Sequence, residues 1–92
     1  MRLMLRFTIP VEKGNQAAED GSMIDSIQTL VEQLQPESTY FYLQDGRRAG
    51  LVVFNAENAS QMAQINEPLF SKLNAEIDIQ PVLDLNDLAP AI

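Results

Sequence analysis

The sequence contains no cysteine, no histidine and no tryptophan among its 92 residues. Without cysteine the chain can form no disulfide, no thiolate nucleophile and no zinc–thiolate site. Without histidine it lacks the side chain whose ordinary pKa best suits proton transfer near neutral pH, which is also the commonest ligand of haem and transition metals. We therefore expect neither a metal site nor a bound cofactor.

Basic residues are also scarce, with six against thirteen acidic ones and a net charge of −7. This charge repels nucleic acid and anionic lipid, so we expect neither as a partner. No apolar run approaches the roughly 18 residues of a membrane span, and Arg6 interrupts the opening MRLMLRFTIP too early for a signal peptide. We expect a cytoplasmic protein with a single domain, residues 1–92, in which residues 84–92 form a C-terminal tail.

The most regular stretch is Thr39 to Phe54, which reads TYFYLQDGRRAGLVVF. Two runs of aromatic and β-branched residues flank Asp45-Gly46, a dipeptide that favours a two-residue type I′ turn. The pattern predicts a β-hairpin in which Tyr40 and Tyr42 share a face with Leu51. A three-residue turn would shift this pairing by one residue, and the sequence leaves both registers open.

Two segments have helical periodicity. The second half of residues 11–37 carries a stripe at spacings of three and four: Ile24, Ile27, Val31 and Leu34. One alternative starts this helix after a turn at 20–22, with Ser22 as N-cap, and the other is one long helix from Lys13. We favour the long helix because Ala17 and Gly21 continue the face of Ile24.

The second helical segment, residues 58–74, has an apolar stripe of Met62, Ile65, Leu69 and Leu73. Asn58 or Ser60 can cap it, and Pro68 is expected to break or kink it.

Alternation of period two predicts strands over Leu3–Ile9 and Glu76–Leu83, and Pro81 marks the second as an edge strand or a bulged one. In the tail, Asn86 could cap one helical turn. The tail also contains three apolar residues, Leu85, Leu88 and Ile92, and we expect them to pack against a partner subunit.

The element order β-α-β-β-α-β predicts a ferredoxin-like α+β sandwich, with an antiparallel sheet in the order 4-1-3-2 and both helices on one face. The helix-covered face is expected to carry Leu3, Leu5, Phe7, Phe41, Val52, Phe54, Ile77 and Ile79. The other face should carry Met4, Arg6, Thr8, Tyr40, Tyr42, Leu51, Val53, Glu76, Asp78 and Gln80. That second face is too apolar for water and too polar for ordinary core, so we expect a second subunit's sheet to cover it.

The element order, the short Asp-Gly hairpin, and the stretches RFTIPVE and EPLF…NAEIDIQPV resemble small uncharacterised bacterial proteins of the dimeric ferredoxin-like α+β barrel superfamily. The resemblance covers nearly the whole chain. It implies a homodimer whose two sheets face each other around a cavity. The superfamily includes cofactor-free monooxygenases, lactone isomerases, haem-degrading enzymes and ligand-sensing domains. The histidine and tryptophan used in some of these branches are absent here, so no catalytic motif carries over.

Five residues on the second face are candidates for ligand binding: Arg6, Tyr40, Tyr42, Glu76 and Asp78. Arg6 needs a partner, which Asp78 or Glu76 on the neighbouring strand could supply, either as part of a binding site for a small polar or anionic ligand or as a purely structural ion pair. The tyrosines could orient a ligand or simply pack at the subunit interface. The two carboxylates could divide acid and base roles or form a solvated edge.

Three functions fit these features. The first is a homodimeric module that binds or senses a small molecule in the cavity between two sheets. The second is a cofactor-free isomerase or monooxygenase, with Arg6, Tyr40 and Asp78 as its working groups. The third is a structural or protein-interaction domain with a filled barrel.

Overall fold

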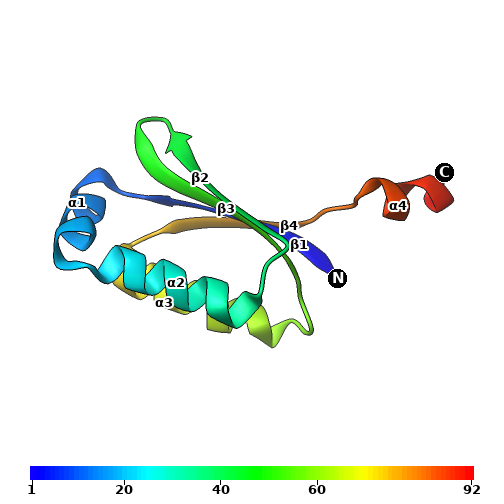
Figure 1. The fold of residues 1–92 in the computed structure, drawn as a ribbon, viewed down its shortest axis with the longest axis horizontal. Coiled ribbons are helices and arrows are strands. Elements are labelled where there is room, and N and C mark those ends of the chain that lie inside the picture. The colour runs from blue at the N-terminus through cyan, green and yellow to red at the C-terminus, as the bar shows by residue number, and fades with distance from the viewer.

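Four antiparallel strands form the sheet on which the rest of the chain is built, as the computed structural model of residues 1–92 shows (Figure 1). The strands are β1 (Arg2–Ile9), β2 (Ser38–Gln44), β3 (Arg47–Asn55) and β4 (Glu76–Pro81), in the order β2-β3-β1-β4. This is the predicted order read from the opposite edge, and the ferredoxin-like α+β class is confirmed. Strand β4 is an edge strand, as Pro81 indicated, but it ends there and not at Leu83.

The core lies between the sheet and the helices. Alternate residues of β1 point into it, and Leu5, Phe7 and Ile9 are at most 2% exposed. Val52 and Phe54 of β3 join them, whereas Ile77 and Ile79 of β4 pack against the core while partly exposed. The period-two pattern therefore identified the buried face of β1, β3 and β4 correctly, but not that of β2.

Phe41 was expected in this core, and that prediction is wrong. Its pairing with Gly50 gives it the expected side of the sheet, yet the side chain is 57% exposed. The β2–β3 hairpin rises away from the helices in Figure 1, and Phe41 of β2 is only partly covered. It borders an apolar hollow of about 230 Å³ that also involves Met23 and Ile24.

The hairpin itself has the two-residue turn. Asp45 and Gly46 have φ angles of 52° and 78°, which is the left-handed backbone that a type I′ turn requires. Gln44 pairs with Arg47, and Tyr40 pairs with Leu51. The register drawn from the two-residue alternative is therefore confirmed.

The segment after β1 forms two helices, α1 (Val11–Asp20) and α2 (Ser22–Leu34), so the favoured single helix is wrong. Gly21 separates them with a φ of 83°, and the backbone nitrogen of Ser22 donates to Asp20 Oδ1 at 2.9 Å. The turn at 20–22 was the other alternative, although Gly21 and not Ser22 takes the cap position. Gly21 permits a left-handed residue at no steric cost, and this local preference outweighs a continuous apolar face.

The buried stripe of α2 also differs from the prediction. Its buried residues are Met23, Ser26, Leu30 and Leu34, whereas Ile24 is 57% exposed. The break at Gly21 frees α2 to rotate independently of α1. Burial of the polar Ser26 carries no cost of an unsatisfied hydrogen bond, because its hydroxyl donates to the Ser22 carbonyl at 2.7 Å.

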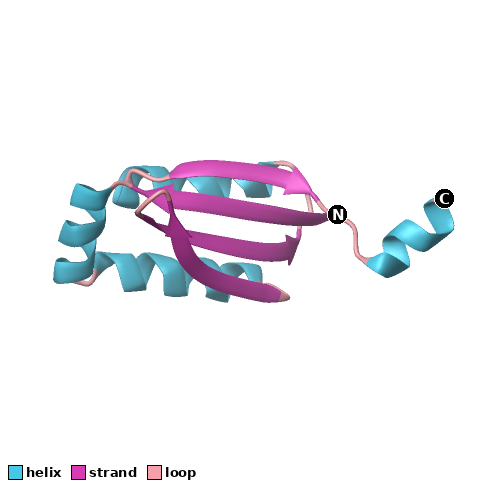
Figure 2. Ribbon diagram, turned by 90° about the horizontal axis from the view of Figure 1, so that it is seen from above, coloured by secondary structure: helices cyan, strands magenta, loops and turns pink.

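Helix α3 (Ser60–Leu73) runs beside α2 beneath the same face of the sheet (Figures 1 and 2). Ile65, Leu69 and Leu73 are buried as predicted. Ala59 takes the N-cap position, not Asn58 or Ser60, although Asn58 Oδ1 accepts a hydrogen bond from the Gln61 nitrogen. Pro68 was expected to break or kink the helix, and it lies within one continuous helix, so there is no break. The residue four positions earlier, Gln64, is exposed, where solvent can replace the missing hydrogen bond.

The tail projects from the far end of the sheet (Figures 1 and 2) and contains α4 (Leu85–Leu88) and a 3₁₀ turn, η1 (Ala89–Ala91). Asp84, not Asn86, caps α4 through a reciprocal capping box with Asp87. Within the chain, Leu85, Leu88 and Ile92 remain exposed.

Arg2 holds the base of this tail. Its Nε lies 2.6 Å from Glu37 Oε1, its Nη2 lies 3.2 Å from Asp84 Oδ2, and its Nη1 donates to Asp87 Oδ2. We call these four residues the Arg2 clasp. The Glu37 hydrogen bond and the neighbouring carboxylates raise the pKa of Arg2 above its usual range, so the clasp keeps its positive centre.

Candidate functional site

The sheet face that no helix covers is the place where the predicted site residues meet, and we call it the open face (Figure 1). Pairing between strands puts Arg6 between Leu51 of β3 and Asp78 of β4. Thr8 lies beside Glu76 in the same way. Alternate residues of each strand share a face, so these side chains and Tyr42 project from the same side of the sheet.

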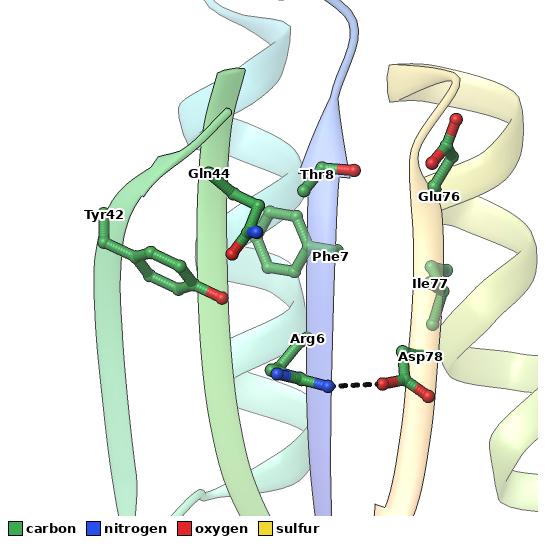
Figure 3. Close-up of a pocket in the computed structure, with 8 residues that line it drawn as sticks. All are labelled: Arg6, Phe7, Thr8, Tyr42, Gln44, Glu76, Ile77 and Asp78. Atoms are coloured by element: carbon green, nitrogen blue, oxygen red, sulfur yellow. Dashed lines mark hydrogen bonds and ion pairs between the residues drawn. The ribbon is translucent and has the colours of Figure 1, made fainter. Parts of the chain in front are cut away.

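A shallow cavity of about 260 Å³ lies on the open face, and we call it the open-face pocket. Its lining consists of Arg6, Phe7, Thr8, Tyr42, Gln44, Glu76, Ile77 and Asp78 (Figure 3). The structure thus brings together four of the five predicted binding residues. Tyr40 is the fifth; it lies outside the pocket, and its side chain is 65% exposed.

Arg6 and Asp78 form the central contact of the pocket. Arg6 Nη2 donates to Asp78 Oδ2 at 2.6 Å, a short charge-assisted hydrogen bond (Figure 3). This bond, followed by the Coulombic attraction of Asp78, raises the pKa of Arg6 above its ordinary value. The side chains are 44% and 59% exposed, so solvent reaches both of them in the single chain.

Glu76 has a different partner from Asp78. Its Oε1 lies 3.8 Å from Arg47 Nη1, and the carboxylate side chain is 78% exposed. A contact at this distance between two exposed groups is weak. Of the two carboxylates in the pocket, Glu76 is therefore the one whose negative charge is less well balanced by a neighbouring arginine.

Neutral polar groups complete the opposite side of the pocket. Tyr42 and Gln44 extend from β2 toward β1, and the Tyr42 hydroxyl is directed toward the middle of the pocket (Figure 3). Thr8 stands between them and Glu76. The carboxylates thus line the β4 side, hydroxyl and amide groups line the β2 side, and the guanidinium of Arg6 lies between.

Thr8 and Gln44 were not among the predicted binding residues. The signal for both was present, because Thr8 follows Arg6 by two positions and Gln44 follows Tyr42 by two positions. A period of two puts such residues on the same face. The pocket combines donors, acceptors and both signs of charge, and it can bind a small polar molecule by hydrogen bonds and ion pairs.

No group of three or more aspartates and glutamates is placed to hold a metal ion. None of the helices combines the length and apolar character that crossing a membrane would require.

Comparison with solved structures identifies several proteins with the same fold. A formyltetrahydrofolate deformylase from Pseudomonas putida KT2440 aligns with a TM-score of 0.59 and 12% identity over 89% of this chain. The alignment covers 29% of the deformylase, so the chain spans less than a third of that enzyme.

Two smaller proteins align over most of both chains. An ACT domain protein from Streptococcus pneumoniae has a TM-score of 0.51 and 16% identity, covering 87% of this chain and 88% of its own. The periplasmic divalent cation tolerance protein CutA from Archaeoglobus fulgidus has a TM-score of 0.50 and 12% identity, covering 91% and 86%. At these identities the likeness shows the shared fold alone.

No curated protein matches the sequence. A family model, Domain of unknown function (DUF3303), matches residues 1–92, the whole length of the chain. The protein therefore belongs to the DUF3303 family.

Proposed function

We propose that the protein is a homodimeric module that binds a small polar molecule between the open faces of its two copies. The observation that carries this proposal is the open-face pocket, where charged and neutral polar groups converge on an otherwise apolar sheet surface. The arrangement corresponds to the dimeric α+β barrel superfamily, which the sequence resembles.

The edge strand β2 supports a partner on this side of the molecule. Tyr40, Phe41, Tyr42 and Leu43 are consecutive, and each is at least 37% exposed. A free edge strand with four large apolar side chains is prone to pair with other chains unless something covers it. A second copy packed across the open face would cover Tyr40 and Tyr42, which project from that face.

The small core gives a further reason for association. Only 18 of the 92 residues are buried, so one chain leaves much apolar surface in contact with water. Met4, Leu51 and Val53 of the open face are each partly exposed. Their burial against a second sheet would add to stability roughly in proportion to the apolar area covered.

The charge of Arg6 favours a binding role for this residue. Arg6 has a raised pKa, so it stays charged and serves as a hydrogen-bond donor and not as a proton donor. A guanidinium that remains charged is well suited to bind a carboxylate or another oxyanion.

Two variants test the proposal by calorimetric titration with small polar metabolites of differing charge. Leu51→Glu introduces a charge at the centre of the open face, and we expect it to separate the copies and weaken ligand binding. Val11→Glu adds the same charge to an exposed apolar residue at the start of α1, away from the open face, and should change neither property. Binding that persists unchanged in a monomeric Leu51→Glu protein would contradict a site between two copies.

A further inference from the structure

We infer that the ligand of the open-face pocket is a small zwitterion of the amino-acid class, carrying a protonated amine and a carboxylate. This inference rests on the proposed function and specifies the chemistry of its ligand. It narrows the sequence-based expectation of a small polar or anionic molecule.

The charges around the pocket are balanced before any ligand binds. Arg6 faces Asp78 at 2.6 Å inside the pocket, and Arg47, which lies outside the pocket lining, faces Glu76 more weakly at 3.8 Å, so two guanidinium groups accompany two carboxylates. A ligand with a net negative charge would upset this balance and would also meet the repulsion of a chain with net charge −7. A ligand with a net positive charge would upset the balance in the other direction, whereas a zwitterion preserves it.

The spatial separation of charge gives the ligand an orientation. Both carboxylates belong to β4, the neutral donors Tyr42 and Gln44 belong to β2, and the guanidinium of Arg6 lies between the two sides (Figure 3). A ligand ammonium would therefore lie at Glu76 and the second oxygen of Asp78. The ligand carboxylate would lie at Arg6 and Tyr42.

Arg6 can bind that carboxylate without releasing Asp78. A guanidinium has five N–H donors in a planar fork, and the structure shows one hydrogen bond from Arg6, through Nη2. Its other donors are available for the two oxygens of a carboxylate. The cavity of about 260 Å³ lies below the usual size range of pockets for drug-sized ligands, which suits a small metabolite.

The test begins with pools of the proteinogenic L-amino acids, measured by thermal shift, and continues by calorimetry with the tightest binder. That amino acid is compared with its C-terminal amide, which lacks the carboxylate charge, and its N-acetyl derivative, which lacks the ammonium charge. We expect each derivative to bind at least about tenfold more weakly, because each loses one charged contact.

Variants link the amine to Glu76. Glu76→Gln should weaken binding of the amino acid by about fivefold or more and leave the N-acetyl derivative unaffected. Glu19→Gln removes an equal charge from an exposed position on α1 and should leave both affinities unchanged. Succinate and putrescine serve as the simple anion and the simple diamine.

The outcomes separate the two proposals. If succinate, putrescine or either derivative binds as tightly as the amino acid, the zwitterion inference is wrong while the pocket remains a binding site. If no probe binds at about 10 mM, far above ordinary ligand affinities, both the inference and the proposed function are contradicted.

Discussion

Arg6 decides, at the scale of single residues, between a binding site and a structural ion pair. We predict that Arg6→Met leaves the urea midpoint almost unchanged, because the pair with Asp78 is solvent-accessible in the folded chain. The same substitution should abolish ligand binding. Midpoints are compared at matched protein concentration, since dimerisation is linked to folding.

The double variant Arg6→Met/Asp78→Val is the control for this prediction. A structural pair buried by the partner would make the single variant strongly destabilised and the double variant largely recovered. That pattern would contradict a ligand-binding role for Arg6.

Gly50 lies directly under the ring of Phe7, and this contact requires glycine. A Cβ atom at position 50 would overlap the ring of Phe7, which is 2% exposed and cannot move freely. We predict that Gly50→Ala lowers the free energy of unfolding by about 1–3 kcal/mol, the usual cost of overpacking a core. Urea denaturation measures the change.

Gly14→Ala is the matched control for Gly50→Ala. Its Cβ would meet only the flexible end of Arg48, with Nη1 at 2.7 Å, and alanine is the better helix former. This variant should be neutral or slightly stabilising. Equal losses from both substitutions would show that the contact with Phe7 is not the cause.

The sequence could place those side chains whose position follows from the alternation of residues between the two faces of a strand. The Arg6–Asp78 contact follows from two antiparallel neighbours and a shared face. The distance between Glu76 and Arg47 and the exposure of Phe41 depend on how the hairpin bends relative to the rest of the molecule, which a residue pattern does not contain.

The helices show, at the scale of elements, how one glycine overrides a periodic pattern. The apolar face from Ala17 to Ile24 favoured one long helix, yet Gly21 ends α1 in the left-handed conformation. We predict that Gly21→Ala destabilises the protein by about 1–2 kcal/mol, because an L-residue is strained there.

Gly21→Asn provides the comparison, since asparagine tolerates the left-handed region better than alanine does. Urea midpoints should therefore follow the order glycine, asparagine, alanine. A stability gain for Gly21→Ala would show that the two helices can join, contrary to the structure.

The tail depends on the Arg2 clasp, which gives it a pH dependence. The hydrogen bond from the Asp84 backbone nitrogen, followed by the charge of Arg2, lowers the pKa of Asp87 in the folded chain. A lowered carboxyl pKa contributes stability above the unfolded pKa, and that contribution is lost as the pH falls through the folded value. We predict that the tail stays attached above the ordinary aspartate pKa of about 3.9 and detaches as the pH falls below that value.

Amide NMR spectra of residues 84–92 measure this detachment. Asp87→Asn cannot titrate at this position, so its tail should already resemble the acid form at neutral pH. Tail resonances that stay unchanged across the acid range in the parent protein would contradict the role of Asp87.

The fold of the whole molecule was predictable because each strand and helix has its own periodic signal and the Asp45-Gly46 turn sets the hairpin register. Right-handed crossover connections and antiparallel pairing of neighbouring strands then permit the order β2-β3-β1-β4. The pocket was predictable only in part, because its shape depends on side chains from three strands and on what covers the open face.

The proposed dimer accounts at this scale for the open face, the exposed β2 edge and the apolar tail together. Deleting residues 85–92 should weaken dimerisation, because Leu85, Leu88 and Ile92 are exposed in their own chain. The dissociation constant measures this effect. An unchanged constant would show that the tail does not contact the partner.

Sedimentation equilibrium of the parent protein at micromolar concentration tests the central claim most directly, because the site is proposed to form between two copies. The account predicts a mass about twice the 10.3 kDa of one chain. A single species at the mass of one chain would contradict it.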